Sequence, residues 1–123
     1  MPLEPTLIAE PYCYLTTVGR VTGRPHEIEI WFGHAQRDGA DVLYLMSGGR
    51  DASDWVRNLM REPAVSVRIA AQTYRARARL IAQEHDEDAL ARRLLFDKYA
   101  PGYEGDLAAW RESALPVALD LER

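Results

Sequence analysis

The sequence predicts an α+β fold in which six strands form a mostly antiparallel sheet, able to close into a small barrel, with helices inserted after the third and fifth strands. Three observations support this prediction. Several segments alternate polar and apolar residues or are rich in β-branched and aromatic residues, which is typical of strands. Two segments carry apolar residues at helical spacing. Turn-forming residues separate most of these segments, and barrel closure would leave no exposed sheet edge.

The six strands are expected at 12–18, 26–32, 42–47, 64–70, 74–81 and 115–122. The second strand has the clearest pattern, because Ile28, Ile30 and Phe32 alternate with polar residues and share one face. A turn rich in glycine joins the first two strands. The sequence QRDGAD predicts a hairpin after the second strand, and the short connection AQT suits a hairpin between the fourth and fifth strands.

Two helices are expected between strands. The segment SGGRDASDWVRNLMREP changes to helical spacing, with Asp51 or Ser53 as its N-cap and Pro63 as its stop. The segment 84–103 begins with acidic residues, which favour a helix N-terminus, and its pattern ends at a proline and a glycine. A short helical turn is expected over 106–110.

Composition limits the class of protein. A chain of 123 residues with 47% hydrophobic content is expected to form one domain over residues 1–123. The net charge of −4 argues against a nucleic-acid partner, and no apolar stretch has the roughly 20 residues that membrane insertion needs. No signal or transit peptide is apparent. The single cysteine, Cys13, has no disulfide or zinc partner, which fits a cytoplasmic protein.

The glycine turn after the first strand, GRVTGRP, is the first candidate binding site. It is not a P-loop, because that motif has one more residue between its glycines and ends in Lys-Ser or Lys-Thr. It is not a Rossmann fingerprint either, because no GxGxxG pattern opens a helix. The guanidinium groups of Arg20 and Arg24, with the hydroxyl of Thr22, could hold a carboxylate or phosphate. Taken alone, the stretch favours a solvated hairpin over a binding loop.

The loop SGGRDASDW is the second candidate. Its backbone N–H groups and the helix N-terminus favour an anion, and Ser47 and Arg50 would add a hydroxyl and a charge. A plain capped turn explains the pattern equally well. Trp55 and Asn58 share a helix face one turn apart, and Trp55 is either a core anchor or a neighbour of a bound ring.

The segment KYAPGYEGDLAAW is the third candidate. Its aromatic residues Tyr99, Tyr103 and Trp110 could cover a flat ligand, and a tyrosine hydroxyl could orient a substrate or deliver a proton. They could equally close the end of a barrel. Three alternating arginines in RARAR, residues 75–79, favour a solvated strand face with cross-strand Glu–Arg pairs. The histidines have no metal-ligand spacing, so no metal site is expected.

Together the stretches YLTTVGRVTGRP, LYLMSGGRDASDWVRNLMREPAVSVRI and YAPGYEGDLAAWRESALPVALDL resemble the deazaflavin-dependent nitroreductase family. Its members are split β-barrel proteins related to the pyridoxamine phosphate oxidase fold. The resemblance runs from about Tyr12 to Leu121. It implies a cytoplasmic oxidoreductase that binds reduced coenzyme F420 and passes its hydride to a flat, electron-poor small-molecule acceptor, a quinone or a nitroaromatic compound. A homodimer is favoured over a monomer, because related barrels often pair through their sheets.

The resemblance also implies roles for individual residues. The cofactor would be bound by Arg20, Thr22, Arg24, Met46, Ser47, Gly48, Gly49, Arg50, Trp55 and Asn58. Tyr99 and Tyr103 match the substrate segment, as positioning residues or proton donors. Family members often carry tail-binding lysines where this chain has Val21 and Gly48. FMN is therefore the alternative cofactor, and a non-catalytic protein that binds a cofactor or another amphipathic ligand is the alternative function.

Overall fold

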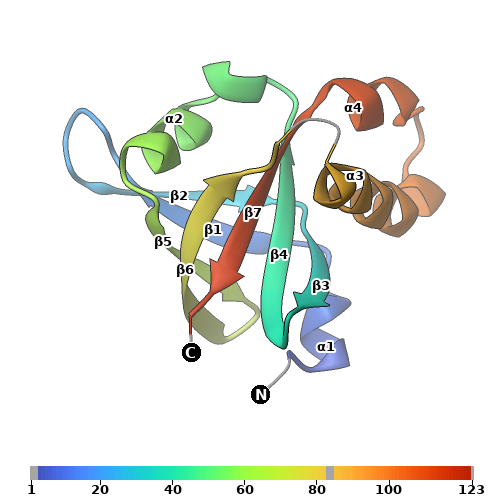
Figure 1. The fold of residues 1–123 in the computed structure, drawn as a ribbon, viewed down its shortest axis with the longest axis horizontal. Helices are drawn as coiled ribbons and strands as arrows, with labels where there is room; N and C mark the ends of the chain where they lie inside the picture. Colours follow the sequence, from blue (N-terminus) through green and yellow to red (C-terminus); the bar gives the residue numbers. More distant parts are fainter. Residues whose placement is uncertain (1–2, 83–84, 123) are drawn as a thin grey trace.

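The computed structural model describes residues 3–82 and 85–122. Within them, seven strands form one antiparallel sheet in the order β2-β1-β5-β6-β7-β4-β3 (Figure 1). The strands are Cys13–Val18 (β1), Pro25–Ile30 (β2), Gly33–Arg37 (β3), Ala40–Ser47 (β4), Ala64–Ile69 (β5), Gln72–Leu80 (β6) and Leu115–Leu121 (β7). The helices are Pro5–Ile8 (α1), Asp54–Arg61 (α2), Asp86–Tyr99 (α3) and Ala108–Ser113 (α4), with short 3₁₀ turns at Arg50–Ala52 and Ala100–Gly102.

The α+β class and the two inserted helices are confirmed, whereas the count of six strands is wrong. The predicted strand 26–32 ends at Ile30, and a further strand begins at Gly33. These two strands lie at opposite edges of the sheet, where Ile30 pairs with Cys13 of β1 and Gly33 pairs with Tyr44 of β4. No ladder joins β2 to β3 among the described residues, so the predicted closure into a barrel is also wrong.

The missed strand boundary has a physical explanation. Polar and apolar residues continue to alternate up to the crossing at residues 31–32, and periodicity does not reveal which neighbour a strand pairs with. Gly33 allows helix α3 to approach, because a Cβ there would lie 3.1 Å from the Cβ of Leu94. The chain therefore leaves one edge of the sheet and enters the other where a helix backbone passes close by.

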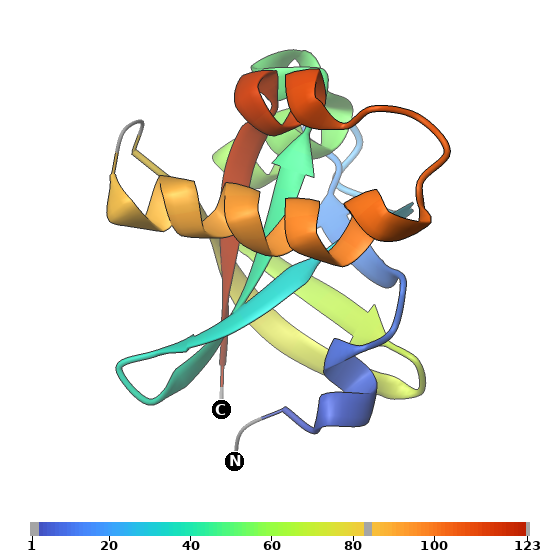
Figure 2. The same cartoon turned by 90° about the vertical axis from the view of Figure 1, so that its right-hand side faces the viewer.

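Apolar residues on both faces of β4 explain its length and position. Leu43 and Leu45 belong to the cluster enclosed by the curved sheet, while Tyr44 and Met46 belong to a second cluster. Helix α3 covers this second cluster and lies across the sheet, in contact with β3, β4 and β7 (Figure 2). Because both faces are covered, the strand is almost continuously buried.

The helix boundaries largely follow the predicted signals. Ser53, rather than Asp51, is the N-cap of α2, and the helix ends just before Pro63. The predicted segment 84–103 contains α3, although Glu84 lies outside the described residues. The turn expected over 106–110 overlaps helix α4, which begins at Ala108 and extends to Ser113. None of the described helices combines the length and apolar character needed to cross a bilayer.

The carboxyl end of α3 anchors the chain crossing. The hydroxyl of Tyr99 donates to the carbonyl of Pro11 at 2.7 Å and accepts from the backbone N–H of Phe32 at 3.0 Å. The ammonium group of Lys98 donates to the carbonyls of Ile8 at 2.9 Å and Phe32 at 3.1 Å. These bonds satisfy backbone groups of Phe32 between β2 and β3 and tie them to the segment that precedes β1, so the crossing is held in one conformation.

Candidate functional site

Two pockets lie along the edge strand β2. The turn pocket has a volume of about 400 Å³ and is lined by the β1–β2 turn, β2 and α2, with Arg20, Thr22, His26, Glu27, Asp54, Trp55 and Asn58 among its residues. The aromatic pocket has a volume of about 590 Å³ and includes Tyr12, Glu29, Trp31, Met46, Tyr103, Asp106, Leu107 and Trp110. Alternate residues of β2 reach the two pockets, with Glu27 in the first and Glu29 in the second.

Arg20 is held in the turn pocket by helix α2. The side-chain oxygen of Asn58 accepts from the backbone N–H of Arg20 at 3.2 Å and from its Nη1 at 2.8 Å. Nη2 of the same guanidinium donates to Oδ1 of Asp54 at 3.0 Å. Asn58 is 4% exposed and donates through Nδ2 to the hydroxyl of Thr17 at 3.2 Å. A buried amide with these partners fixes where the arginine points.

The turn itself has a compact backbone. The N–H of Gly19 donates to the carbonyl of Arg24 at 2.8 Å, and Gly23 has a φ of 75°, which glycine adopts without strain. The hydroxyl of Thr22 accepts from the N–H of Arg24 at 3.2 Å. Thr22 therefore supports the turn, while Val21 and Arg24 are exposed.

The loop after β4 is closed by its own side chains. The hydroxyl of Ser47 donates to the carbonyl of Arg50 at 2.9 Å and lies 2.6 Å from the hydroxyl of Ser53. A Cβ at Gly49 would lie 2.6 Å from that second hydroxyl, so the position favours glycine. The guanidinium of Arg50 donates to the carbonyl of Ser113 at the end of α4. These contacts make the loop a support for α4.

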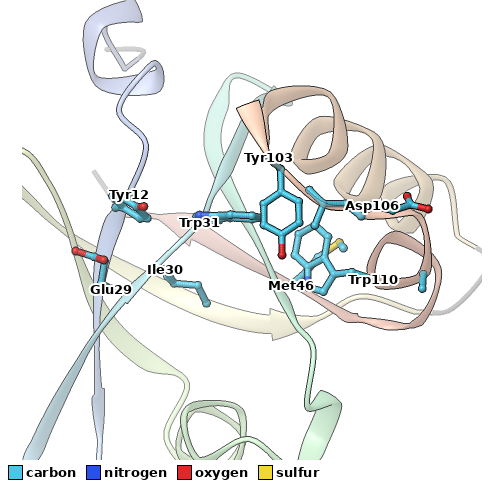
Figure 3. Close-up of a pocket in the computed structure, with 10 residues that line it drawn as sticks. Tyr12, Glu29, Ile30, Trp31, Met46, Tyr103, Asp106 and Trp110 are labelled. Atoms are coloured by element: carbon cyan, nitrogen blue, oxygen red, sulfur yellow. The ribbon is translucent and has the colours of Figure 1, made fainter. Parts of the chain in front are cut away.

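Trp31 is the centre of the aromatic pocket (Figure 3). One face stacks on Tyr99, with centroids 4.3 Å apart and planes 4° apart. Tyr103 and Trp110 meet Trp31 edge to face, with centroids 5.9 Å and 5.6 Å away. Burial raises the pKa of Tyr99 to about 12, and its hydroxyl is bonded to backbone. Tyr103 lines the pocket and is 47% exposed.

Comparison with known proteins identifies the family. Residues 4–122 match the family described as F420H2-dependent quinone reductase, which is nearly the whole chain. The chain belongs to the F420H2-dependent quinone reductase family. The predicted resemblance to deazaflavin-dependent reductases is thereby confirmed, and the protein is an oxidoreductase of an F420-dependent family.

Solved structures share the fold of this quinone reductase family member. An F420 reductase matches with a TM-score of 0.66 and 21% identity, over 100% of this chain and 97% of that one. The haem storage protein HutZ from Vibrio cholerae matches with a TM-score of 0.68 and 18% identity, over 100% and 92%. A FAD-binding protein from Mesorhizobium loti matches with a TM-score of 0.68 and 14% identity, over 95% and 83%. At these identities the likeness establishes the fold alone.

The residues that were predicted to bind the cofactor of this quinone reductase family member lie in several parts of the structure. Four of them line the turn pocket, namely Arg20, Thr22, Trp55 and Asn58. Met46 lines the aromatic pocket together with Tyr103. Ser47, Gly49 and Arg50 belong to the supporting loop, Gly48 faces Trp110, Arg24 is exposed on the turn, and Tyr99 lies behind Trp31.

Two residues of the site were not predicted from the sequence. Trp31 was not predicted as a site residue. It follows Glu27 and Glu29 on one face of the predicted strand, and a large aromatic residue on an otherwise charged face is a signal that could have identified it. Asp54 was not singled out, because pairing between the β1–β2 turn and α2 is a tertiary contact with no local pattern. Both residues adjoin predicted ones, so the site is larger than the motifs alone indicate.

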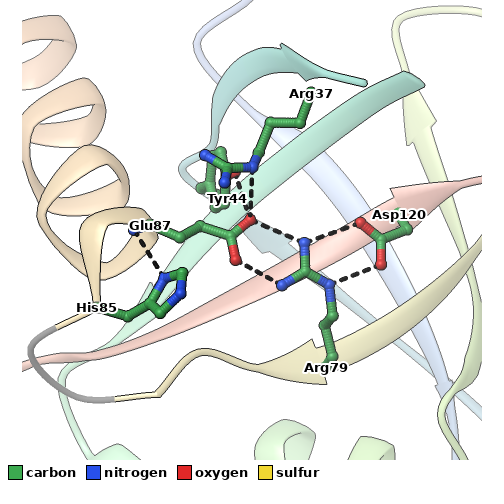
Figure 4. Close-up of polar contacts among 6 residues, drawn as sticks. All are labelled: Arg37, Tyr44, Arg79, His85, Glu87 and Asp120. Atoms are coloured by element: carbon green, nitrogen blue, oxygen red, sulfur yellow. Dashed lines mark hydrogen bonds and ion pairs between the residues drawn. The ribbon is translucent and has the colours of Figure 1, made fainter. Parts of the chain in front are cut away.

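A second polar cluster lies away from both pockets, between β4, β6, β7 and α3 (Figure 4). Its centre is Glu87, which is 5% exposed. The carboxylate accepts from Arg79 at 2.6 Å and 2.8 Å and from the hydroxyl of Tyr44 at 2.7 Å. Arg79 also donates to Asp120 at 2.7 Å, so the predicted solvated face is partly an internal network. Its groups are mutually bonded, which indicates a structural role in holding α3.

This cluster predicts acid sensitivity in the quinone reductase. Hydrogen bonding from Arg79 lowers the pKa of Glu87 to about 2. Because the folded pKa lies below the unfolded one, the stabilisation is complete above about pH 5 and is lost as the pH falls toward 2. We expect this group to remove about 3 kcal/mol from the free energy of unfolding over that range.

Urea denaturation at successive pH values measures this loss. The variant Glu87→Gln carries no titrating carboxyl at that position, so its unfolding free energy should fall less steeply than that of the wild type. Parallel curves for the two proteins would contradict the assignment.

Proposed function

We propose that this protein transfers a hydride from reduced F420 to a flat, electron-poor acceptor of the quinone or nitroaromatic class. The observation that carries the proposal is the placement of two unlike pockets along one strand. The turn pocket presents an oriented guanidinium, and the aromatic pocket presents flat apolar walls. A cofactor with an anionic tail and a planar ring needs both kinds of surface.

The donor set of the turn pocket fits the anionic part of F420. Arg20 offers a charged donor whose position is fixed by Asn58, and Arg24 is exposed on the same turn. Guanidinium groups bind phosphate and carboxylate through paired N–H donors. In the proposed complex Arg20 binds the tail, while Trp55 and Thr22 shape the pocket around it.

The aromatic pocket fits a planar ring. Trp31 and Trp110 meet edge to face, and Met46 is 4% exposed beside them, so the walls can exclude water from a bound ring. When bound, reduced F420 supplies the hydride. The protein contributes position and a water-poor surface, which explains why no nucleophile–base pair is needed.

Tyr103 is the proposed proton donor to the reduced acceptor. Its ring lies against Trp31 and its side chain is half-exposed in the pocket, whereas the hydroxyl of Tyr99 is bonded to the backbone. Tyr103→Phe is expected to lower kcat about tenfold or more, since a positioned acid contributes about 10²–10⁴ and water replaces part of it. Stopped-flow oxidation of reduced F420 by menadione measures the change.

The matched control is Tyr74→Phe, which removes a hydroxyl from β6 outside both pockets. Its turnover should equal that of the wild type. An unchanged kcat for Tyr103→Phe would assign the proton to water.

A binding and turnover experiment tests the proposed function. Oxidised F420 should change its fluorescence on titration with a Kd below about 100 µM, and reduced F420 should be oxidised in the presence of menadione. No binding in this range would remove F420 as the cofactor. Tight binding without turnover would instead support a non-catalytic binding protein.

A second candidate is a flavin-dependent oxidoreductase on the same fold. The likeness to a FAD-binding protein at a TM-score of 0.68 supports this candidate, because that protein has the same fold and binds a flavin. A parallel titration with FMN distinguishes the two cofactors, since the candidate predicts tight binding of FMN and none of F420.

A further inference from the structure

We propose that Asp54 is a resident counter-ion of Arg20 that is exchanged for an anionic group of the bound ligand. In this way Asp54 sets how strongly the turn pocket selects charged ligands. The proposal rests on the proposed function of the site, and it assigns a specificity role to a residue at the start of α2.

Arg20 has two side-chain partners, and its contacts distinguish an exchangeable one, Asp54, from a fixed one, Asn58. Nη2 donates to the Asp54 carboxylate at 3.0 Å, whereas Nη1 donates to Asn58 at 2.8 Å and to the backbone carbonyl of Asp54 at 3.4 Å. The carboxylate therefore occupies one edge of the guanidinium. A phosphate or carboxylate of a ligand would need that same edge for a charge-assisted hydrogen bond.

Asn58 keeps the guanidinium in place without Asp54. It binds both the backbone and the side chain of Arg20, and it is itself buried against the hydroxyl of Thr17. Loss of the Asp54 carboxylate should therefore free Nη2 without releasing the arginine from the pocket. Removal of the Asp54 carboxylate therefore tests the exchange itself, whereas removal of Asn58 would also take away the support of Arg20.

Exposure makes the Arg20–Asp54 pair easy to exchange. The Asp54 side chain is 86% exposed and the Arg20 side chain 28% exposed. A pair this exposed contributes little to stability, so a better-placed anion can replace its carboxylate. Glu27 also lines the pocket, so two carboxylates share it with Arg20. The resident carboxylates therefore reduce the attraction of the pocket for anions.

Binding measurements with two deazaflavins test the exchange. Oxidised F420 carries the phosphate and glutamyl tail, and the corresponding deazaflavin nucleoside lacks both. Asp54→Asn is expected to bind oxidised F420 about two- to fivefold more tightly, with no change for the nucleoside. In the Arg20→Ala background, Asp54→Asn should give no gain. Glu62→Gln removes the same charge at the other end of α2 and should leave both affinities unchanged.

Inorganic pyrophosphate provides a readout independent of F420. Its stabilisation of the protein in thermal unfolding should be larger for Asp54→Asn than for the wild type, and the difference should vanish in the Arg20→Ala background. If F420 binds neither protein but this difference is present, the proposed function fails and the exchange is supported. If Asp54→Asn shows no gain with either F420 or pyrophosphate, the exchange is overturned.

Discussion

Replacing Arg20 by alanine is expected to weaken the binding of oxidised F420 by about 1–3 kcal/mol, because a charge-assisted hydrogen bond to the ligand would be lost. The guanidinium is positioned by a buried amide, so a bound anion meets a donor that needs little further ordering. Fluorescence titration of the purified variant measures the effect. A folded Arg20→Ala variant with unchanged affinity would make the turn an ordinary hairpin.

Arg61→Ala is the matched control for this variant. It removes an arginine from the exposed end of α2, outside both pockets, and should bind F420 as the wild type does. Asn58→Ala provides a second comparison, because it removes the support of Arg20 and not the charge. It should weaken binding less than Arg20→Ala while also lowering stability.

Replacing Glu87 by alanine is expected to lower the free energy of unfolding by about 3 kcal/mol, since removal of one partner leaves buried polar groups without a hydrogen bond. The hydroxyl of Tyr44 is fully buried and donates to this carboxylate. Arg79 keeps Asp120 as a partner, which places the effect at the lower end for a buried pair. Urea denaturation at neutral pH measures the loss.

Asp86→Ala is the control for the stability variant. It removes another acid from the first turn of α3, but its side chain is exposed. We expect a loss of about 0.3–1 kcal/mol from the helix dipole alone. Equal losses for the two variants would mean that the buried network contributes nothing beyond the helix-dipole interaction.

Much of the fold could be predicted because local patterns determine local structure. The six expected strands are all present, and the helix after β4 ends before Pro63 as predicted. The seventh strand, β3, could not be predicted, because the alternation of β2 ends in the apolar residues 30–32 and the sequence of β3, GHAQR, contains no β-branched residue. Their separation depends on pairing with β1 and β4, which are distant partners that periodicity does not encode.

The candidate site could be predicted as motifs and not as geometry. The glycine turn and the α2 residues Trp55 and Asn58 line one pocket, which the resemblance implied. The support of Arg20 by Asn58 is a tertiary contact across the chain, and no local spacing indicates it. Likewise, stacking places Tyr99 behind Trp31, while the adjacent 3₁₀ turn leaves Tyr103 in the pocket.

Strand β7 has a consequence for how the molecule folds. It pairs with β4 on one side and β6 on the other, so it joins the β3–β4 hairpin to the sheet formed by β1, β2, β5 and β6. Both pairings link distant parts of the chain, and such long-range closure is slower than hairpin formation. Helix α2, which lines the turn pocket together with the β1–β2 turn, contacts β1 and β6 of that sheet. The turn pocket therefore lies on one side of the strand that closes the structure, and β7 supplies no residue to it.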